Sequence, residues 1–305
     1  MGKIAFVFAG QGAQYSGMGL GMAQSFEASN EVFKALDAIR PHTSEQCFFG
    51  SEETLRETKN TQPCIFAVEM SCAAALSQHG IYANMVAGFS VGELAALTYS
   101  GAMDLQTGFS LVCRRGELMR QAAEQQPAAM AAVLRLSNNE VERICAGFSK
   151  IYPVNYNCPG QISVSGAEDE MPSFILAVKA AGGRAIPINV KGGFHSPFMK
   201  PAAEAFSLEI EKLSFSIPSV PVYSNYTGKP YSESIRELLS MQIFSPVRWE
   251  QSIRNMIEAG ADTFLELGPG HTLSGLISKI DPDVRTFSIS DQSGLDTVLS
   301  EVKQC

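Results

Sequence analysis

The sequence predicts an α/β fold, in which a large domain built on a mainly parallel sheet carries a small inserted subdomain. Two features of the 305 residues lead to this prediction. Short apolar runs that end at glycines alternate with longer segments whose apolar residues recur at helical spacing, a pattern typical of parallel sheets. Between about residues 128 and 190 the strand-length runs lie closer together, which indicates a second unit.

The first part of the large domain, predicted to span residues 1–127, begins with a buried strand over Lys3–Ala9, an apolar run bounded by Gly10 and Gly12. A second strand is predicted over Asn84–Phe89. The spacing of apolar residues predicts helices over Gly17–Ala38, Pro63–His79, Val91–Tyr99 and Leu105–Glu124.

The inserted subdomain, predicted to span residues 128–195, has the element order β-α-β-β-α-β, which is the ferredoxin-like arrangement. A capping box from Ser137 to Glu140 marks the start of its first helix, which runs to about Ala146. Cys158-Pro159-Gly160 is a turn signal between its two middle strands. The strands are predicted over Met130–Leu136, Ile151–Asn157, Gln161–Ser165 and Arg184–Val190, and the second helix over Glu168–Ala181.

The large domain resumes at residue 196 and is predicted to continue to residue 305. The α/β pattern returns there, and the strand that ends at Leu267 is closed by Gly268-Pro269-Gly270 and followed by another helix. Helices are predicted over Lys200–Lys212, Glu233–Ile243 and Gln251–Ala259, and strands over Val220–Ser224 and Thr263–Leu267.

The composition disfavours several classes of function. Hydrophobic residues make up 45% of the chain and charged residues 18%, which is ordinary for a globular protein with a sizeable core. The formal net charge is −8 and there is no run of basic residues, so nucleic-acid binding, which depends on clustered Lys and Arg, is disfavoured. No apolar stretch approaches 18 residues, so we predict no membrane span.

The cysteines and glycines predict neither a metal site nor a cofactor. The seven cysteines are odd in number and scattered, and none forms a CxxC pair or a Cys/His cluster with zinc spacing. We therefore predict reduced thiols in a cytoplasmic protein. The Gly10-Gln11-Gly12 segment lacks the glycine spacing and the downstream acid of a dinucleotide site.

Gly88-Phe89-Ser90-Val91-Gly92 is the strongest local signal, a GxSxG at a strand-to-helix junction. A serine on such a turn exposes its hydroxyl at the edge of the sheet, and the flanking glycines leave room for a strained backbone. Ser90 also lies at a helix N-terminus, where free N–H groups favour a developing oxyanion. The pattern therefore predicts a nucleophilic serine, with the N–H of Val91 as an oxyanion donor.

A serine nucleophile needs a base, and the chain has four histidines. His195 lies in a Gly-rich loop that joins the two predicted domains, where catalytic residues are often found. The residues alone leave this choice open, because each of the other three also has an ordinary structural interpretation. These are His42, in a polar loop; His79, at a helix end; and His271, at a helix start.

Two further features are ambiguous when they are taken by themselves. The Gly10-Gln11-Gly12 segment is equally consistent with a tight turn and with a close approach of backbone N–H groups to a ligand. Arg114 and Arg115 fall inside an amphipathic helix, and surface arginines are usually solvated.

Seven motifs follow one another along essentially the whole chain: Gly10-Gln11-Gly12-Ala13-Gln14, Gly88-Phe89-Ser90-Val91-Gly92-Glu93, Arg115-Gly116, Asn157-Cys158-Pro159-Gly160-Gln161, Phe194-His195-Ser196, Gln242-Ile243-Phe244-Ser245-Pro246-Val247 and Glu266-Leu267-Gly268-Pro269-Gly270. In this order they resemble the malonyl-CoA:acyl-carrier-protein transacylase family. The resemblance implies a hydrolase-like large domain. It also implies a ping-pong transfer of malonyl from coenzyme A to the pantetheine thiol of acyl carrier protein, by default in fatty-acid synthesis.

The resemblance also implies roles for particular residues. Ser90 is expected to be the nucleophile and His195 the general base, oriented by the backbone carbonyl of Gln242 in place of the acid of a Ser-His-Asp triad. The N–H groups of Gln11 and Val91 are expected to form the oxyanion hole.

The same resemblance assigns the substrate contacts. Arg115 is expected to grip the free carboxylate of malonyl with its planar fork, and Asn157 to line the cleft between the domains. Phe194 matches members that are selective for malonyl. Phe89 is a departure, because the commonest family form has His before the nucleophile.

The expected partners are malonyl-CoA and acyl carrier protein, bound by a monomer. Lys191 and Lys200 flank the His195 loop and are expected to form a basic rim that attracts the carrier protein. The alternatives are a stand-alone acyltransferase of a polyketide synthase, an acyl-carrier-protein hydrolase, an α/β-hydrolase esterase and a non-catalytic binding module. The intact Ser90, His195 and Arg115 weigh against the binding module, and Arg115 weighs against the carrier-protein hydrolase.

Overall fold

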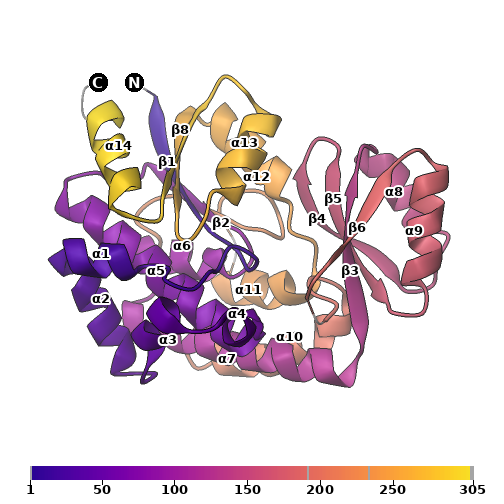
Figure 1. Cartoon of the computed structure of the whole chain (residues 1–305), viewed down its shortest axis with the longest axis horizontal. Coiled ribbons are helices and arrows are strands. Elements are labelled where there is room, and N and C mark those ends of the chain that lie inside the picture. The colour runs from indigo at the N-terminus through magenta and orange to yellow at the C-terminus, as the bar shows by residue number, and fades with distance from the viewer. Residues whose placement is uncertain (1, 191, 233, 303–305) are drawn as a thin grey trace.

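The computed structural model describes residues 2–190, 192–232 and 234–302, and it contains two separate sheets (Figure 1). The larger sheet has the strand order β7-β2-β1-β8-β9, and every neighbouring pair in it is parallel. Its strands are β1 (Lys3–Phe8), β2 (Met85–Gly88), β7 (Val222–Tyr223), β8 (Ala261–Leu267) and β9 (Arg285–Ile289).

Helices cover both faces of the larger sheet, because the central strand is apolar on both sides. Alternate residues of a strand point to opposite faces. Phe6 and Phe8 join a core cluster with one group of helices, whereas Ala5 and Val7 join a second cluster. The second cluster contains α12 (Trp249–Glu258) and α13 (Thr272–Ile280), and the first contains α5 (Thr58–Gln78), α6 (Gly92–Tyr99), α7 (Leu105–Gln125), α10 (Lys200–Ile210) and α11 (Ile235–Phe244).

The smaller sheet is antiparallel, with the order β4-β5-β3-β6, and α8 and α9 pack against it. The element order along the chain is β-α-β-β-α-β, which confirms the ferredoxin-like prediction. The capping box of Ser137 and Glu140 is present as predicted. The elements are β3 (Ala128–Leu134), α8 (Asn138–Cys145), β4 (Ile151–Cys158), β5 (Gln161–Ala167), α9 (Met171–Ala180) and β6 (Arg184–Ile188).

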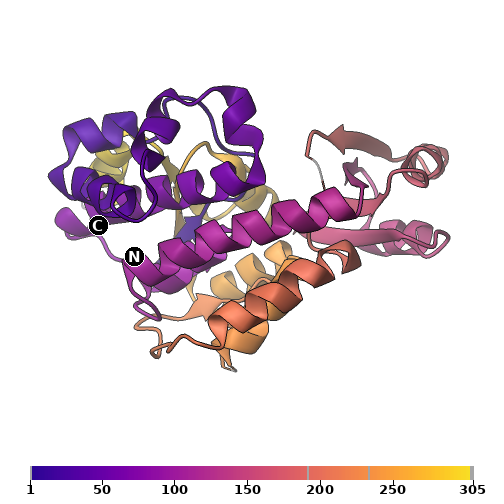
Figure 2. The same ribbon diagram turned by 90° about the horizontal axis from the view of Figure 1, so that it is seen from below.

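We call residues 128–190 the small-sheet region and the remaining described residues the main-sheet region. All four strands of the smaller sheet fall inside the predicted insert, and the domain boundaries at residues 127/128 and 195/196 remain our proposal. Figure 2 shows α7 as a long helix that runs through the main-sheet region toward the small-sheet region, where the chain enters β3.

Several elements differ from the sequence predictions. The single helix predicted over Gly17–Ala38 is wrong, because Phe26 is extended at φ −131° and ψ 120° and separates α1 (Leu20–Ser25) from α2 (Glu27–Asp37). Helix α5 begins five residues before Pro63, which the first turns of the helix accommodate. Five elements were not predicted: the helices α3 (Thr43–Phe49), α4 (Glu52–Arg56) and α14 (Gln292–Val302), the short 3₁₀ helix η1 (Pro197–Met199) and the strand β9. Within the described residues, no helix is both long and apolar enough to cross a membrane.

Candidate active site

The site lies at the carboxyl ends of the parallel strands, where open α/β sheets usually bind ligands. β2 ends at Gly88 and α6 begins at Gly92, so Ser90 occupies the turn between them with a left-handed φ of 56°. A Cβ on Gly88 would overlap the carbonyl of Gly92, and a Cβ on Gly92 would overlap the carbonyl oxygen of Phe8. Both glycines are therefore required for the serine to take this position.

Ser90 and His195 lie in direct contact. The Ser90 Oγ is 2.7 Å from the His195 Nε2, and the His195 Nδ1 is 2.9 Å from the backbone oxygen of Gln242. A carbonyl oxygen can only accept, so Nδ1 carries the proton and Nε2 accepts from the Ser90 hydroxyl.

The surroundings keep His195 neutral. Burial, followed by the positive charge of Arg115, lowers the pKa of His195 from 6.5 to about 3. The imidazole therefore has a free lone pair at Nε2 at neutral pH, as a general base requires.

The other three histidines lie elsewhere in the fold. His42 is exposed and its Nδ1 is 2.8 Å from Glu45. His79 contacts the backbone oxygen of Ala75 at the end of α5, and His271 is the residue before α13. Among the four, the structure brings only His195 to Ser90.

Arg115 extends from α7 into the same site and is only 1% exposed. Its Nη1 donates to Gln62 Oε1 at 2.7 Å, and its Nη2 donates to Gln242 Oε1 at 2.9 Å and to Ser90 Oγ at 3.2 Å. Burial lowers the pKa of Arg115 to about 10, so the group stays charged. The neighbouring Arg114, by contrast, lies at the surface and pairs with Glu209.

The main chain offers donors near the serine. The N–H groups of Gln11 and Val91 have no hydrogen-bond acceptor among the described residues. The N–H of Ser90 is already used, since it donates to Asn225 Oδ1 at 2.7 Å. Gly10 brings the Gln11 loop close to the serine turn, because a Cβ there would lie 2.7 Å from the Phe89 ring.

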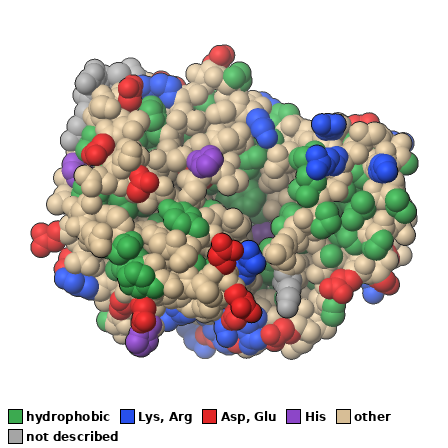
Figure 3. All heavy atoms as spheres, in the orientation of Figure 1, with side chains coloured by type: hydrophobic (Ala, Val, Ile, Leu, Met, Phe, Trp, Pro, Cys, Tyr) green, Lys and Arg blue, Asp and Glu red, His purple; other side chains and the backbone are tan. Residues whose placement is uncertain are grey.

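A cavity of about 100 Å³ opens onto these groups. Its walls are mostly apolar, and they include Phe194, which is 7% exposed. The lining residues are Gln11, Gln62, Phe89, Ser90, Val91, Arg115, Met119, Met130, Asn155, Ile188, Val190, Phe194 and His195. Figure 3 shows hydrophobic side chains in the hollow between the two regions.

The other residues singled out in the sequence are Asn157, Phe89, Lys191 and Lys200. Asn157 is buried in β4 and donates to Ser163 Oγ at 3.2 Å, and it is Asn155, two residues earlier, that lines the cavity. Phe89 packs edge-on against Trp249 at 5.4 Å between ring centroids, so this position is apolar here. Lys200 is exposed at the start of α10, whereas Lys191 lies outside the described residues.

Two polar residues of the site, Gln62 and Asn225, were not predicted from the sequence. Gln62 precedes Pro63 in α5, and Asn225 follows β7. Both are nearly fully buried. Burying a side-chain amide costs free energy unless the amide is hydrogen-bonded. The burial of Gln62 and Asn225 beside Arg115 and Ser90 therefore identifies them as part of the site once the fold is known.

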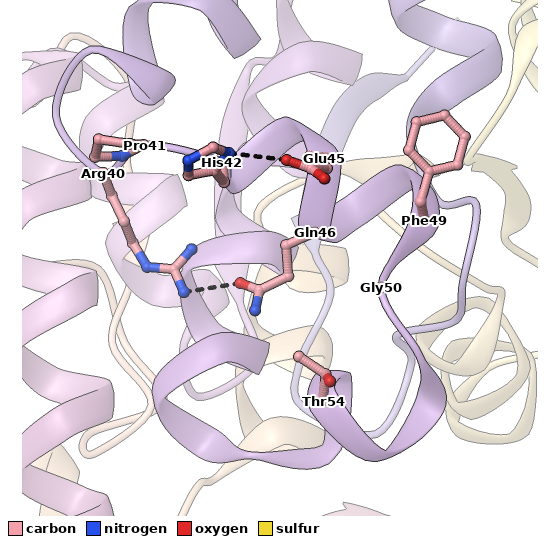
Figure 4. Close-up of a pocket in the computed structure, with 8 residues that line it drawn as sticks. All are labelled: Arg40, Pro41, His42, Glu45, Gln46, Phe49, Gly50 and Thr54. Carbon is pink, nitrogen blue, oxygen red and sulfur yellow. Dashed lines mark hydrogen bonds and ion pairs between the residues drawn. The ribbon is translucent and has the colours of Figure 1, made fainter.

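A larger depression of about 310 Å³ lies elsewhere on the main-sheet region. In Figure 4, Arg40 points toward Gln46 and His42 toward Glu45, so its charged side chains already have partners. None of the predicted site residues lines it. Across the described part of the chain, we also find no cluster of His, Cys, Asp and Glu arranged to hold a metal ion.

The chain matches known proteins along its whole length. Residues 5–280 match the acyl transferase domain family. A malonyl CoA-acyl carrier protein transacylase of Bacillus subtilis (strain 168) is 35% identical over 312 residues, which cover 100% of this chain and 98% of the relative.

Solved structures agree with these matches. The crystal structure of a malonyl CoA-acyl carrier protein transacylase from Clostridium perfringens superposes with a TM-score of 0.96 at 38% identity, covering 99% of this chain and 98% of that one. A type II PKS acyl-carrier protein in complex with its malonyl-transacylase gives a TM-score of 0.94 at 32% identity, covering 98% and 99%. These matches, together with the site geometry, show that the chain belongs to the malonyl-CoA:acyl-carrier-protein transacylase family of acyltransferases.

Proposed function

We propose that this enzyme transfers a malonyl group from malonyl-CoA to the pantetheine thiol of an acyl carrier protein. The observation that carries the proposal is the buried guanidinium of Arg115, 3.2 Å from the Ser90 hydroxyl and on the wall of the cavity. Among the described residues, no carboxylate forms an ion pair with it. A buried cation beside a nucleophile is suited to an acyl group that brings its own carboxylate.

In the first half-reaction, Ser90 Oγ attacks the thioester carbonyl of malonyl-CoA while His195 Nε2 takes the hydroxyl proton. The negative oxygen of the tetrahedral intermediate accepts from the N–H groups of Gln11 and Val91. The carbon–sulfur bond then breaks, and His195 returns the proton to the departing thiol. The backbone oxygen of Gln242 keeps the imidazole oriented throughout.

The second half-reaction reverses these roles with a different thiol. The pantetheine thiol of the carrier protein gives its proton to His195 and its sulfur attacks the ester carbonyl. The carbon–oxygen bond to Ser90 breaks, and the serine oxygen recovers the proton from His195. No metal or cofactor takes part in either half.

The substrate contacts follow from the same geometry. Arg115 holds the malonyl carboxylate, with Gln62 fixing one arm of its fork, and Phe194 closes the cavity against bulkier acyl groups. We keep Asn157 as a residue that supports the cavity wall without itself lining the cavity, because its buried side chain donates to Ser163 Oγ. The exposed Lys200 and, from the sequence, Lys191 remain our candidates for the attraction of the carrier protein.

The pathway and the setting are also proposals. We propose fatty-acid synthesis, with the enzyme acting as a cytoplasmic monomer. The structural relative in complex with a type II PKS acyl-carrier protein keeps polyketide synthesis as the second candidate. The esterase alternative is less well supported, because the partner of His195 Nδ1 is a backbone carbonyl and not an acid.

The direct test is incubation with malonyl-CoA followed by intact-protein mass spectrometry. Wild type is expected to gain one malonyl group and Ser90→Ala none. Adding holo-acyl carrier protein is then expected to move the group to the carrier, whereas a hydrolase would release malonate to water. Absence of the adduct in wild type, or its persistence in Ser90→Ala, would contradict the assignment of Ser90.

A further inference from the structure

Asn225 lies where the edge strand of the larger sheet meets the serine turn. It follows β7, which pairs in parallel with β2, so the carboxyl ends of the two strands are neighbours. The residue is 1% exposed. It comes from a part of the chain 135 positions away from Ser90 and belongs to none of the seven sequence motifs.

The side chain of Asn225 bridges the two sides of the serine turn. Its Nδ2 donates to the backbone oxygen of Gly88 at 2.6 Å, and its Oδ1 accepts from the N–H of Ser90 at 2.7 Å. One amide group therefore satisfies the last carbonyl of β2 and the N–H of the nucleophile. A non-glycine residue at a φ of 56° needs such support to stay in place.

The backbone of Asn225 is fixed as well. Its N–H donates to Glu93 Oε1 at 3.1 Å, and its carbonyl accepts from the N–H of Arg248 at 2.8 Å. The same Glu93 oxygen accepts from the Tyr231 hydroxyl at 2.6 Å. Glu93 is fully buried in the first turn of α6, three residues after Ser90. Every polar group of Asn225 is thus paired, and Glu93 ties the residue to the helix that carries the nucleophile.

We propose that Asn225 is a positioning residue for the nucleophile and that Glu93 and Tyr231 hold it in place. The inference rests on the proposed function of Ser90. By fixing the turn, Asn225 keeps the Ser90 Oγ 2.7 Å from His195 Nε2. By occupying the N–H of Ser90, it leaves Gln11 and Val91 as the main-chain donors for the oxyanion.

A fluorophosphonate probe, which reacts with an activated serine, tests the positioning role of Asn225 independently of the acyl specificity of the enzyme. The Ser90 Oγ attacks phosphorus, the O–P bond forms as the P–F bond breaks, fluoride leaves and His195 takes the proton. In Asn225→Ala we expect the labelling rate to fall by about 10- to 100-fold, because a nucleophile displaced by a fraction of an ångström loses its alignment. The Kd of malonyl-CoA is expected to stay within about threefold, since Arg115 and the cavity walls are untouched.

Asn84→Ala is the matched control. Its Oδ1 also accepts a backbone N–H, that of Ile4 at 2.8 Å, but at the opposite end of β2 from Ser90. This variant is expected to label at the wild-type rate. Equal slowing in both variants, or wild-type labelling in a folded Asn225→Ala, would overturn the proposal.

Tyr231→Phe keeps the inference testable even if Asn225→Ala does not fold. It removes only the hydroxyl that donates to Glu93, and we expect labelling to slow by about 3- to 10-fold with an unchanged Kd for malonyl-CoA. An unchanged labelling rate would overturn the role of Glu93 and Tyr231. A wild type that reacts with the probe but gains no malonyl group would refute the proposed function and leave this inference standing.

Discussion

The main-sheet region and the small-sheet region line the same cavity with different kinds of side chain. The main-sheet region contributes apolar residues such as Phe194, and it alone also contributes Ser90, His195, Arg115 and Gln62, which are joined to one another or to Gln242 by hydrogen bonds. From the small-sheet region come Met130, Asn155, Ile188 and Val190. The hydrogen bonds therefore hold the polar groups of the main-sheet side in a fixed geometry, whereas the small-sheet side mainly limits the volume of the acyl group.

The two sides of the cavity therefore tolerate different substitutions. A hydrogen-bonded catalytic group loses its function when it is displaced by a fraction of an ångström. An apolar wall loses only a little packing when a methyl group is removed, and the cavity then admits a larger ligand. Substitutions of the hydrogen-bonded groups on the main-sheet side should therefore change the reaction rate or, at Arg115, the preference for a carboxylate-bearing acyl group. Substitutions on the small-sheet side should change the size of acyl group that the cavity accepts.

The largest effect is expected for His195→Ala. Without a base the Ser90 hydroxyl is a weak nucleophile, so acyl transfer should fall by about two to four orders of magnitude. Transfer to acyl carrier protein is the measurement, and His271→Ala is the control, because that residue lies before α13 without contact to Ser90. A comparable loss in His271→Ala would mean that the base is assigned to the wrong residue.

The pH dependence of the same step follows from the pKa of about 3 for His195. A base whose pKa is lowered stays unprotonated down to that pH, so the acylation rate should not fall between pH 8 and pH 5. An imidazole with its ordinary pKa of about 6.5 would lose most of its activity across that range. Burial also raises the pKa of Glu93, which bonds Asn225 beside the serine turn, to about 7, so the profile is measured in Glu93→Gln as well. A half-maximal rate near pH 6.5 that persists in Glu93→Gln would contradict the buried, neutral state of His195.

A smaller effect is expected on the small-sheet side, in Val190→Ala. Removing two methyl groups from the half-buried Val190 should raise kcat/KM for a malonyl group that carries one methyl branch by about tenfold, with little change for malonyl itself. Ile186→Ala is the matched control, because this neighbour is 36% exposed and does not line the cavity. Equal effects in both variants would mean that this wall does not limit the acyl group.

Much of the main-sheet side was predictable because local sequence dictates it. The glycines at 88 and 92 are required by close backbone contacts, so the serine turn is encoded in five consecutive residues. In the small-sheet region, the capping box at Ser137 is likewise local. The break between α1 and α2 was not predicted, because Phe26 carries no breaker signal and its extended backbone depends on how the two helices pack.

The hydrogen-bond partners of the proposed catalytic groups were harder to predict. Gln62 and Arg115 are 53 residues apart, and Asn225 and Ser90 are 135 residues apart. Their pairing depends on which strands and helices become neighbours in the fold, which no local pattern states. For the same reason the residue of β4 that faces the cavity, Asn155 and not Asn157, could be identified only from the structure.

Arg115 is the group that we propose selects a carboxylate-bearing acyl chain. The most direct measurement is the ratio of kcat/KM for malonyl-CoA to kcat/KM for acetyl-CoA, in wild type and in Arg115→Ala. We expect the ratio to fall by the equivalent of about 2–5 kcal/mol, because the malonyl carboxylate would lose its buried partner. Arg115→Lys should restore part of it, since an ammonium lacks the planar fork.

Arg114→Ala serves as the control for this measurement, because its side chain is 44% exposed and pairs with Glu209 away from the site. It should leave the ratio unchanged. In Arg115→Ala we expect a selective loss of malonyl transfer, with acetyl transfer kept or improved. The same malonyl-to-acetyl ratio in Arg115→Ala and in wild type would contradict this role of Arg115.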